Sequence, residues 1–258
     1  MIFEDTLLGR DEFIKHAAKL AVSHHVVKRE GNVTYLPDVE ACAAQIRDTY
    51  QRITSEYRDD GYAAMPAEEW IVDNYHKIQE QIDFFLHAKA KRSGLFSRGL
   101  LKGLPVIELY DGKVKRCALR IYTVASEIIA HTDGHPDESA VTEFVDYYQK
   151  TAPLTTAELC ELPTMLRLSL LMRLSSVCAI TDRIQSERET AEHVFERYIS
   201  YISSRGGDGA PAGTRRAAAR EAARAMEVWL NSIGDLTPVF AESILRLAAK
   251  WSDRKSVV

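Results

Sequence analysis

The chain has 258 residues, of which 46% are hydrophobic and 27% are charged, with only 13 glycines and 8 prolines. This composition is typical of a folded globular protein and excludes disorder of the whole chain. The net charge of −4, from 33 basic and 37 acidic residues, leaves no basic excess. Nucleic acid is therefore not an expected partner, because a polyanion is held mainly by clustered basic side chains.

The N-terminal residues lack the charged and apolar segments of a signal peptide. No stretch approaches the roughly 20 uncharged apolar residues of a membrane span. The four cysteines, Cys42, Cys117, Cys160 and Cys178, contain no C-x-x-C pair. They predict small buried thiols in a reducing compartment, with neither a disulfide nor a zinc framework. We expect a cytoplasmic chain with no membrane span, cofactor or metal.

Apolar residues recur every three to four positions through most of the chain, which predicts an all-α fold. We expect a bundle of about eight helices with one long central helix. Alternation of period two is weak and confined to residues 104–110. The predicted helices span residues 11–22, 38–58, 66–91, 115–132, 137–150, 156–204, 215–233 and 238–251.

Several of these helices begin at residues suited to that position. Pro66 suits a first helical position, and Asp137 can cap the helix that follows it. Thr155 and Glu158 have the spacing of a capping box, in which each side chain binds a backbone amide of the other. The helix beginning there has the most apolar face and is expected to form the central core. Arg167 and Arg173 lie within it, which argues against a membrane span.

A glycine-rich segment divides the chain. Residues 203–213 contain four Gly and one Pro in eleven positions, which is too many for a stable helix. We therefore expect a helical body over residues 1–204, a flexible linker over 205–213 and a two-helix tail over 214–258. Two short helices bury little apolar surface alone, so the tail is expected to pack on the body or on a partner.

The predicted helix 66–91 has two unlike faces. An apolar stripe runs from Ile71 to Phe85, and Asp73, His76 and Glu80 share an arc almost opposite to it. These polar groups could bind a metal or form an acid–base relay, and they could equally be a solvated face with local ion pairs. Large apolar side chains interrupt the polar face and favour a covering protein surface; they are Trp70, Val72 and Phe84.

A second polar cluster, His131-Thr132-Asp133-Gly134-His135-Pro136-Asp137, lies where one predicted helix ends and the next begins. It resembles a metal loop, but no third group of ligands follows at a known spacing. Gly134 as a left-handed C-cap, with His131 near the negative helix end, explains the same residues. The chain also lacks phosphate-loop, dinucleotide, serine-hydrolase and H-E-x-x-H motifs. The residues therefore supply no nucleophile and no cofactor cradle.

Four segments resemble the cyclic β-1,2-glucan synthase family. Residues 70–82 are similar to its W-L-L-D-N-[FY]-H-x-[IV]-x-E-Q-I segment, and residues 130–134 to its A-H-T-D-[SG] turn. Residues 144–167 follow its F-V-x-x-Y-Q…P-L-T-x-x-E-L-W…L-R order, and residues 20–26 its L-A-x-S-H-x-V opening. The sequence departs from the family at Cys160, where Trp is usual, at Leu119, where Pro is common, and in the loop 92–104.

The resemblance implies a very large parent, associated with the inner membrane, that transfers glucose from UDP-glucose into β-1,2-glucan. The matched region resembles the helical part that precedes the transferase. It implies that this chain, a fragment or divergent relative, is a non-catalytic scaffold or interaction domain and not by itself an enzyme. Its partner would be the remainder of a larger synthase or a second copy, with glucan or UDP-glucose as candidate ligands.

The motif residues are candidates for a polar network between helices. They are Asp73, Asn74, His76, Glu80, Arg120, His131, Asp133, Glu158 and Arg167. We expect Arg167 to pair with Glu158, Asp73 or Asp133, because a buried unpaired guanidinium is costly.

The alternative is a stand-alone helical metal-binding or sugar-binding protein, or a small enzyme. Its polar groups would be Asp73, His76, His131 and Asp133. The aromatic residues expected to be exposed for sugar binding are Trp70, Tyr75 and Tyr122.

Overall fold

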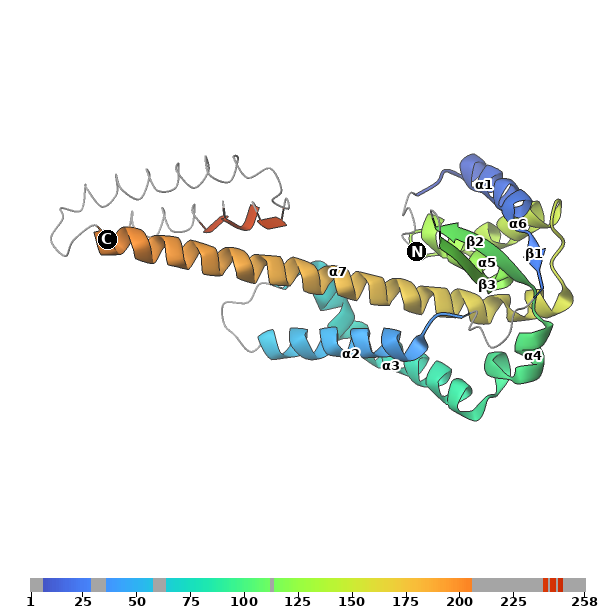
Figure 1. The fold of residues 1–258 in the computed structure, drawn as a ribbon, viewed down its shortest axis with the longest axis horizontal. Coiled ribbons are helices and arrows are strands. Elements are labelled where there is room, and N and C mark those ends of the chain that lie inside the picture. The colour runs from blue at the N-terminus through green and yellow to red at the C-terminus, as the bar shows by residue number, and fades with distance from the viewer. Residues whose placement is uncertain are drawn as a thin grey trace. The chain divides into compact units, whose positions relative to one another are not determined.

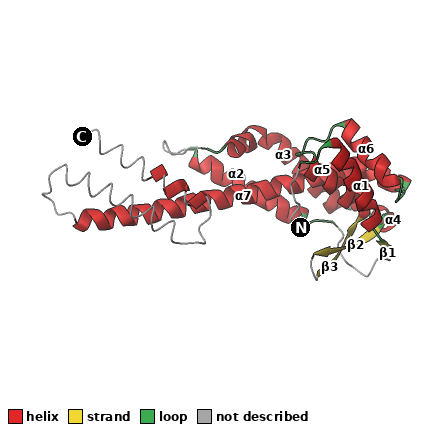
Figure 2. Cartoon of the chain, turned by 90° about the horizontal axis from the view of Figure 1, so that it is seen from above, coloured by secondary structure: helices red, strands yellow, loops and turns green. Residues whose placement is uncertain are grey.

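The structure is a computed structural model that describes residues 7–28, 36–57, 64–111, 114–205, 239–240, 242–244 and 246–247. It confirms the all-α prediction, since helices account for most of the described residues and the strands form one small sheet (Figures 1 and 2). The chain divides into two compact units, Met1–Ala179 and Ile180–Val258. The residues discussed below as sites all belong to the first unit.

Most helices lie where the apolar periodicity predicts them. They are α1 (Arg10–Ser23), α2 (Val39–Glu56), α3 (Pro66–Lys91), α5 (Arg120–His131), α6 (Glu138–Gln149) and α7 (Thr156–Arg205), with the short α4 (Arg98–Gly103) and the 3₁₀ helix η1 (Gly94–Phe96). The predicted linker 205–213 falls almost wholly outside the described residues, and helix 215–233 wholly outside them. The described residues within the predicted helix 238–251 are helical.

The predicted caps explain where several helices begin. Pro66 is the first residue of α3, and the Asp137 side chain accepts a hydrogen bond from the Ala140 amide at the start of α6. At α7 the Glu158 amide donates to Thr155 Oγ1 at 3.2 Å, and the Thr155 amide donates to Glu158 Oε2 at 2.8 Å. Thr155 and Glu158 therefore form the predicted capping box.

The small sheet corrects one predicted helix. Strands β1 (Val26–Val27), β2 (Val106–Asp111) and β3 (Val114–Leu119) form an antiparallel sheet in that order. The prediction of a helix from residue 115 is wrong, because α5 begins only at Arg120. Six residues are too few to separate the two periodicities, and pairing with β2 decides the conformation of β3. Figure 1 shows this sheet beside α5, which β3 contacts.

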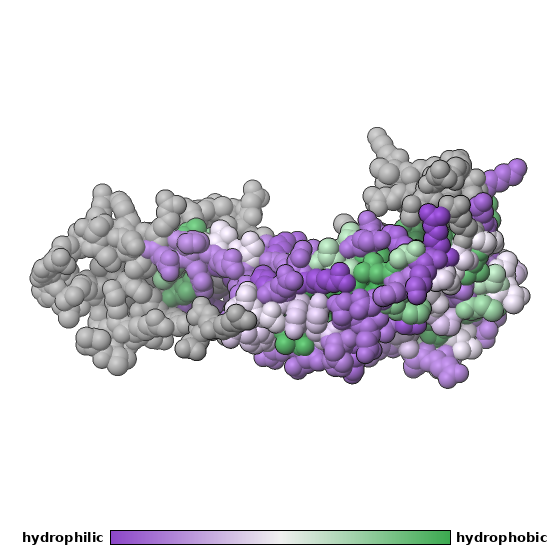
Figure 3. Space-filling view, turned by 90° about the horizontal axis from the view of Figure 1, so that it is seen from below, coloured by the Kyte–Doolittle hydropathy of each residue, from purple (hydrophilic) through white to green (hydrophobic). Residues whose placement is uncertain are grey.

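The core of the first unit follows the predicted stripe of α3. The stripe residues Ile71, Ile78, Ile82 and Phe85 are all buried. α2 packs on α3, and α1 packs on α6. Polar and charged side chains cover most of the described surface in Figure 3, with apolar side chains in small patches. The cysteines are free, and Cys160 is exposed rather than buried as predicted.

The core covers part of the apolar stripe predicted for α7, which runs from Leu159 to Cys178. The stripe members Leu162, Met165, Leu171 and Cys178 are buried, whereas Leu159, Leu170 and Val177 are more than one-third exposed. The apolar arc of α7 is wider than its contact with the core. By length and composition, residues 156–196 could cross a membrane, but core helices of globular proteins meet the same criteria.

Candidate functional site

A pocket of about 490 Å³ lies between α3, the turn after α5, and α7. Three of the four segments that resemble the synthase family contribute to it. Its lining residues are Trp70, Asn74, Lys77, Ile78 and Gln81 from α3, Asp133, Gly134 and His135 from the turn, and Arg167, Leu170, Leu171, Arg173, Leu174 and Val177 from α7. The motif segments are therefore neighbours in space as well as similar in sequence.

The floor of this pocket is apolar and open to solvent. Ile78 and Leu171 are buried, but Leu170 and Val177 are 36% and 37% exposed. Trp70 of α3 lines the same pocket and is 55% exposed. Clustered exposed apolar side chains are typical of surfaces that bind another molecule. That a second protein surface covers Trp70 stays a prediction.

Arg167 lines the pocket, but it does not pair with a carboxylate as predicted. Its Nε and Nη2 atoms both donate to Gln81 Oε1, at 2.9 and 2.5 Å. Its guanidinium also lies over the Phe84 ring, 4.3 Å from the centroid. Arg167 is exposed, so water solvates its charge and no buried counter-charge is required.

The turn after α5 owes its shape to two left-handed residues. Gly134 has φ 70° and its amide donates to the Ile129 carbonyl at 3.2 Å, as expected of the predicted C-cap. Asp133 has φ 52°, which is uncommon for a residue with a side chain. Its carboxylate is exposed and lies 3.9 Å from Arg173 Nη2. Asp133 therefore has a role in the turn and at the pocket edge.

The proposed metal set on α3 is not brought together. Asp73, His76 and Glu80 are exposed and do not line the pocket, whereas Asn74 lines it and donates to the Trp70 carbonyl at 2.9 Å. Among the described residues, none of the possible metal-binding groups of three includes a residue of α3. The solvated-face interpretation of this arc fits the structure.

The buried ion pair of the motif region joins Arg120 to Glu158. Arg120 Nε donates to Glu158 Oε1 at 2.8 Å, and Arg120 Nη2 donates to Glu158 Oε2 at 2.6 Å. The two side chains are 7% and 0% exposed. The hydrogen bonds to Glu158 raise the pKa of Arg120, against the opposite effect of burial. Both residues are predicted network candidates, but Glu158 pairs with Arg120 instead of Arg167.

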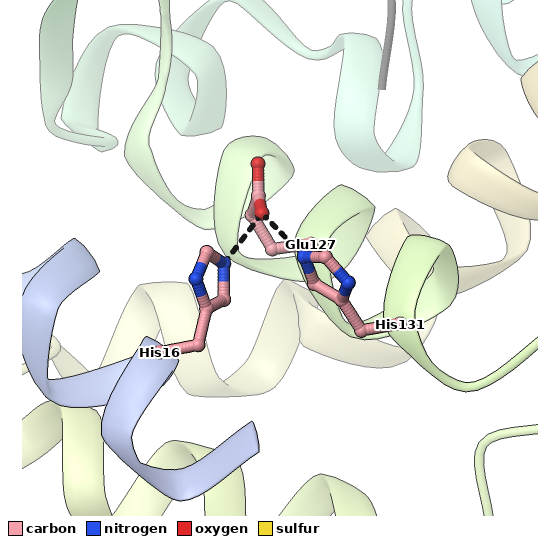
Figure 4. Close-up of side chains that lie close together, drawn as sticks. All are labelled: His16, Glu127 and His131. Atoms are coloured by element: carbon pink, nitrogen blue, oxygen red, sulfur yellow. Dashed lines mark hydrogen bonds and ion pairs between the residues drawn. The ribbon is translucent and has the colours of Figure 1, made fainter. Parts of the chain in front are cut away.

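Glu127 lies between two histidines at the contact of α1 with α5 (Figure 4). Its Oε2 atom is 2.7 Å from His16 Nε2 and 3.3 Å from His131 Nε2. Of the three, only His131 is predicted from the sequence. Glu127 and His131 have helical i, i+4 spacing, which is a usable signal, but His16 is 111 residues from Glu127.

The aromatic residues predicted for sugar binding are mostly occupied in the protein. The Tyr75 ring stacks on Tyr50 with centroids 3.5 Å apart, and Tyr122 is buried. The prediction that Tyr75 and Tyr122 are exposed is therefore wrong. Trp70 is the member of this set that is available at the surface.

His24, in the segment that resembles the family's opening motif, is buried against α6. Its Nδ1 atom is 2.8 Å from the Tyr148 hydroxyl, and its Nε2 atom has no hydrogen-bond partner among the described residues. Burial lowers the pKa of His24 to about 4, although the Glu127 carboxylate acts in the opposite direction. His24 is therefore neutral in the folded protein at neutral pH.

We expect acid to destabilise the fold through His24. Between about pH 6.5 and pH 4 the unfolded chain binds a proton that the folded chain does not, so the free energy of unfolding falls as the pH falls. The loss is on the order of 3 kcal/mol by pH 4. Urea unfolding across this range should show a shallower pH dependence for His24→Gln than for the exposed-site control His25→Gln. Equal slopes in the two variants would contradict this account.

The fold and site together describe a predominantly helical domain with an open, apolar-floored pocket. No protein-family model matches the chain. The chain is 26% identical over 162 residues to cyclic β-(1,2)-glucan synthase NdvB of Rhizobium meliloti (strain 1021). The aligned region covers 60% of this chain and 5% of that relative. The chain thus spans a small part of the relative's length. This match supports a distant relationship to a cyclic glucan synthase.

Proposed function

We propose that this chain is a non-catalytic helical scaffold domain of a cyclic β-1,2-glucan synthase-like glycosyltransferase. The observation that carries the proposal is the pocket, because three segments similar to that family line it and its floor is apolar. The scaffold would hold an apolar segment of the larger synthase on the cytoplasmic side of its membrane. The parent would transfer glucose from UDP-glucose.

The pocket suits a protein segment better than a reacting sugar. Leu170, Leu174 and Val177 form one face at helical spacing, which matches the apolar groove that receives an amphipathic helix. Glycoside hydrolysis commonly uses a pair of carboxylates, and Asp133 is the one carboxylate among the described lining residues. Three cationic side chains, Lys77, Arg167 and Arg173, also line the pocket. They favour a helix with acidic flanks.

The apolar pocket should make the isolated chain self-associate or bind its own tail. If the chain self-associates, light scattering should show association in the micromolar range. If the pocket binds the tail, thermal unfolding should show a change in stability when the chain is cut at Gly206. Val177→Lys should abolish the effect, because it places a charge on the pocket floor. Val22→Lys, at an exposed valine of α1 outside the pocket, is the matched control. Monomeric behaviour of every form, with unchanged stability, would remove the support for a docking surface.

Activity assays and binding calorimetry on the purified chain distinguish the scaffold proposal from catalysis and from sugar binding. The scaffold proposal expects no hydrolysis of UDP-glucose and no elongation of a glucan, and turnover of either would overturn it. The exposed Trp70 beside Asn74 favours glucan binding as a second candidate, since sugar rings stack on exposed indoles. Calorimetry with short β-1,2-glucans tests this candidate, and Trp70→Ala should then remove the binding heat.

A further inference from the structure

The trio His16, Glu127 and His131 joins two helices that are far apart in sequence. Glu127 and His131 lie one turn apart on α5, and His16 reaches them from α1. Both imidazole Nε2 atoms face the same carboxylate oxygen in Figure 4. The three ligand atoms all lie within 4.8 Å of one another. Three potential donors therefore converge on a single point.

The spacing of these atoms is close to that of a metal site. Zinc bonds to imidazole nitrogen and carboxylate oxygen are about 2.0–2.2 Å long, so donors on one tetrahedral ion stand about 3.3 Å apart. The His131 Nε2 to Glu127 Oε2 distance is 3.3 Å. The His16 Nε2 to Glu127 Oε2 distance is 2.7 Å, as in a hydrogen bond. Binding an ion would require the His16 Nε2 to Glu127 Oε2 distance to open from 2.7 Å to about 3.3 Å, and the two imidazole nitrogens already lie within 4.8 Å of each other.

Burial and charge also suit a bound cation. The side chains of His16, Glu127 and His131 are 29%, 19% and 10% exposed, so the donors are sheltered but reachable. A carboxylate oxygen and two imidazole nitrogens are ligand types that zinc takes in proteins, and the negative carboxylate offsets part of the charge of the ion.

We propose that His16, Glu127 and His131 bind a divalent transition-metal ion such as zinc, which clamps α1 to α5. Two imidazole nitrogens favour zinc and related ions over magnesium and calcium, which prefer oxygen ligands. Three protein donors leave one tetrahedral position for water. The site is separate from the pocket, since none of the three residues lines it. The metal-site proposal therefore does not depend on the proposed scaffold function.

The test is zinc binding to the full chain after treatment with a chelator. Calorimetry should give about one zinc per chain, and the melting temperature should rise with zinc because the ion binds the folded state. His16→Gln and Glu127→Gln should each weaken zinc binding by more than about 100-fold. Replacing a residue that only hydrogen-bonds to a metal ligand already lowers metal affinity by about 10–100-fold. The matched controls are His76→Gln and His135→Gln, at exposed histidines outside the trio.

A second measurement uses the wild-type chain, so it does not require any variant to fold. Cobalt(II) is paramagnetic, so at one equivalent it should shift the imidazole NMR signals of His16 and His131 in the wild-type chain and leave His76 unchanged. Absence of zinc binding by the folded wild type would overturn the proposal and leave a trio held by hydrogen bonds only. Unchanged affinity in both His16→Gln and Glu127→Gln would overturn it too. Loss of binding in His76→Gln would move the site to α3.

Discussion

Arg120→Met should lower the free energy of unfolding by about 3–5 kcal/mol. The substitution removes both hydrogen bonds to Glu158 and leaves that fully buried carboxylate without its counter-charge. It also removes the Arg120 Nη2 donor from the Pro153 carbonyl, which accepts it at 3.1 Å. Methionine keeps much of the side-chain volume, so the loss reports charge and hydrogen bonding more than packing. Urea or thermal unfolding measures it.

Arg167→Met is the matched control for this prediction. Arg167 is exposed, and its partners are Gln81 and the Phe84 ring. We expect this variant to lose about 1 kcal/mol or less. The double variant Arg120→Met with Glu158→Gln should recover part of the stability, because it no longer buries an unpaired charge. Equal losses for Arg120→Met and Arg167→Met would show that the buried pair has no special weight.

Phe85→Ala should cost about 3–5 kcal/mol, because it opens a cavity in the core. The Phe85 ring is fully buried and belongs to the apolar stripe of α3. Its neighbour Phe84 is 44% exposed and meets the Phe85 ring edge-on, with centroids 5.1 Å apart. Phe84→Ala should therefore cost about 1 kcal/mol, through lost contact with Arg167 and with Phe85. Chemical unfolding of the two variants gives the comparison directly.

The pair of adjacent phenylalanines tests the assignment of the two faces of α3. Both substitutions remove the same ring from the same helix and change helix propensity equally. A larger loss for Phe84→Ala than for Phe85→Ala would place the core on the opposite face. Such a result would contradict both the structure and the apolar stripe from Ile71 to Phe85.

The helices that could be predicted are those whose signals are local. Pro66 begins α3 because proline suits the first helical position, and Thr155 with Glu158 begins α7 through a capping box. The strand β3 carries no comparable local signal. Its conformation depends on pairing with β2, which brings Val106 opposite Leu119 across the sheet. Sequence periodicity over six residues cannot report that partner.

The candidate site could be predicted only in part, for a related reason. The motif residues Asn74, Asp133 and Arg167 do line one pocket. The partner of Arg167 was predicted wrongly, because the direction of a side chain on α7 depends on which arc of the helix meets the core. His16 and Glu127 lie on separate helices and carry no common motif. Contacts of this kind arise from packing between helices, and spacing along the chain does not encode them.

Glu158 gives the fold one further property, since its carboxylate has two roles. The oxygen Oε2 accepts from the Thr155 amide at the start of α7 and also from Arg120 Nη2 at the start of α5. Fraying of the first turn of α7 would therefore deprive Arg120 of its counter-charge, and withdrawal of α5 would weaken the cap of α7. Unfolding of either helix end alone therefore also breaks the hydrogen bonds that stabilise the other end. The two ends form one cooperative unit, so partial unfolding at either of them carries the cost of both.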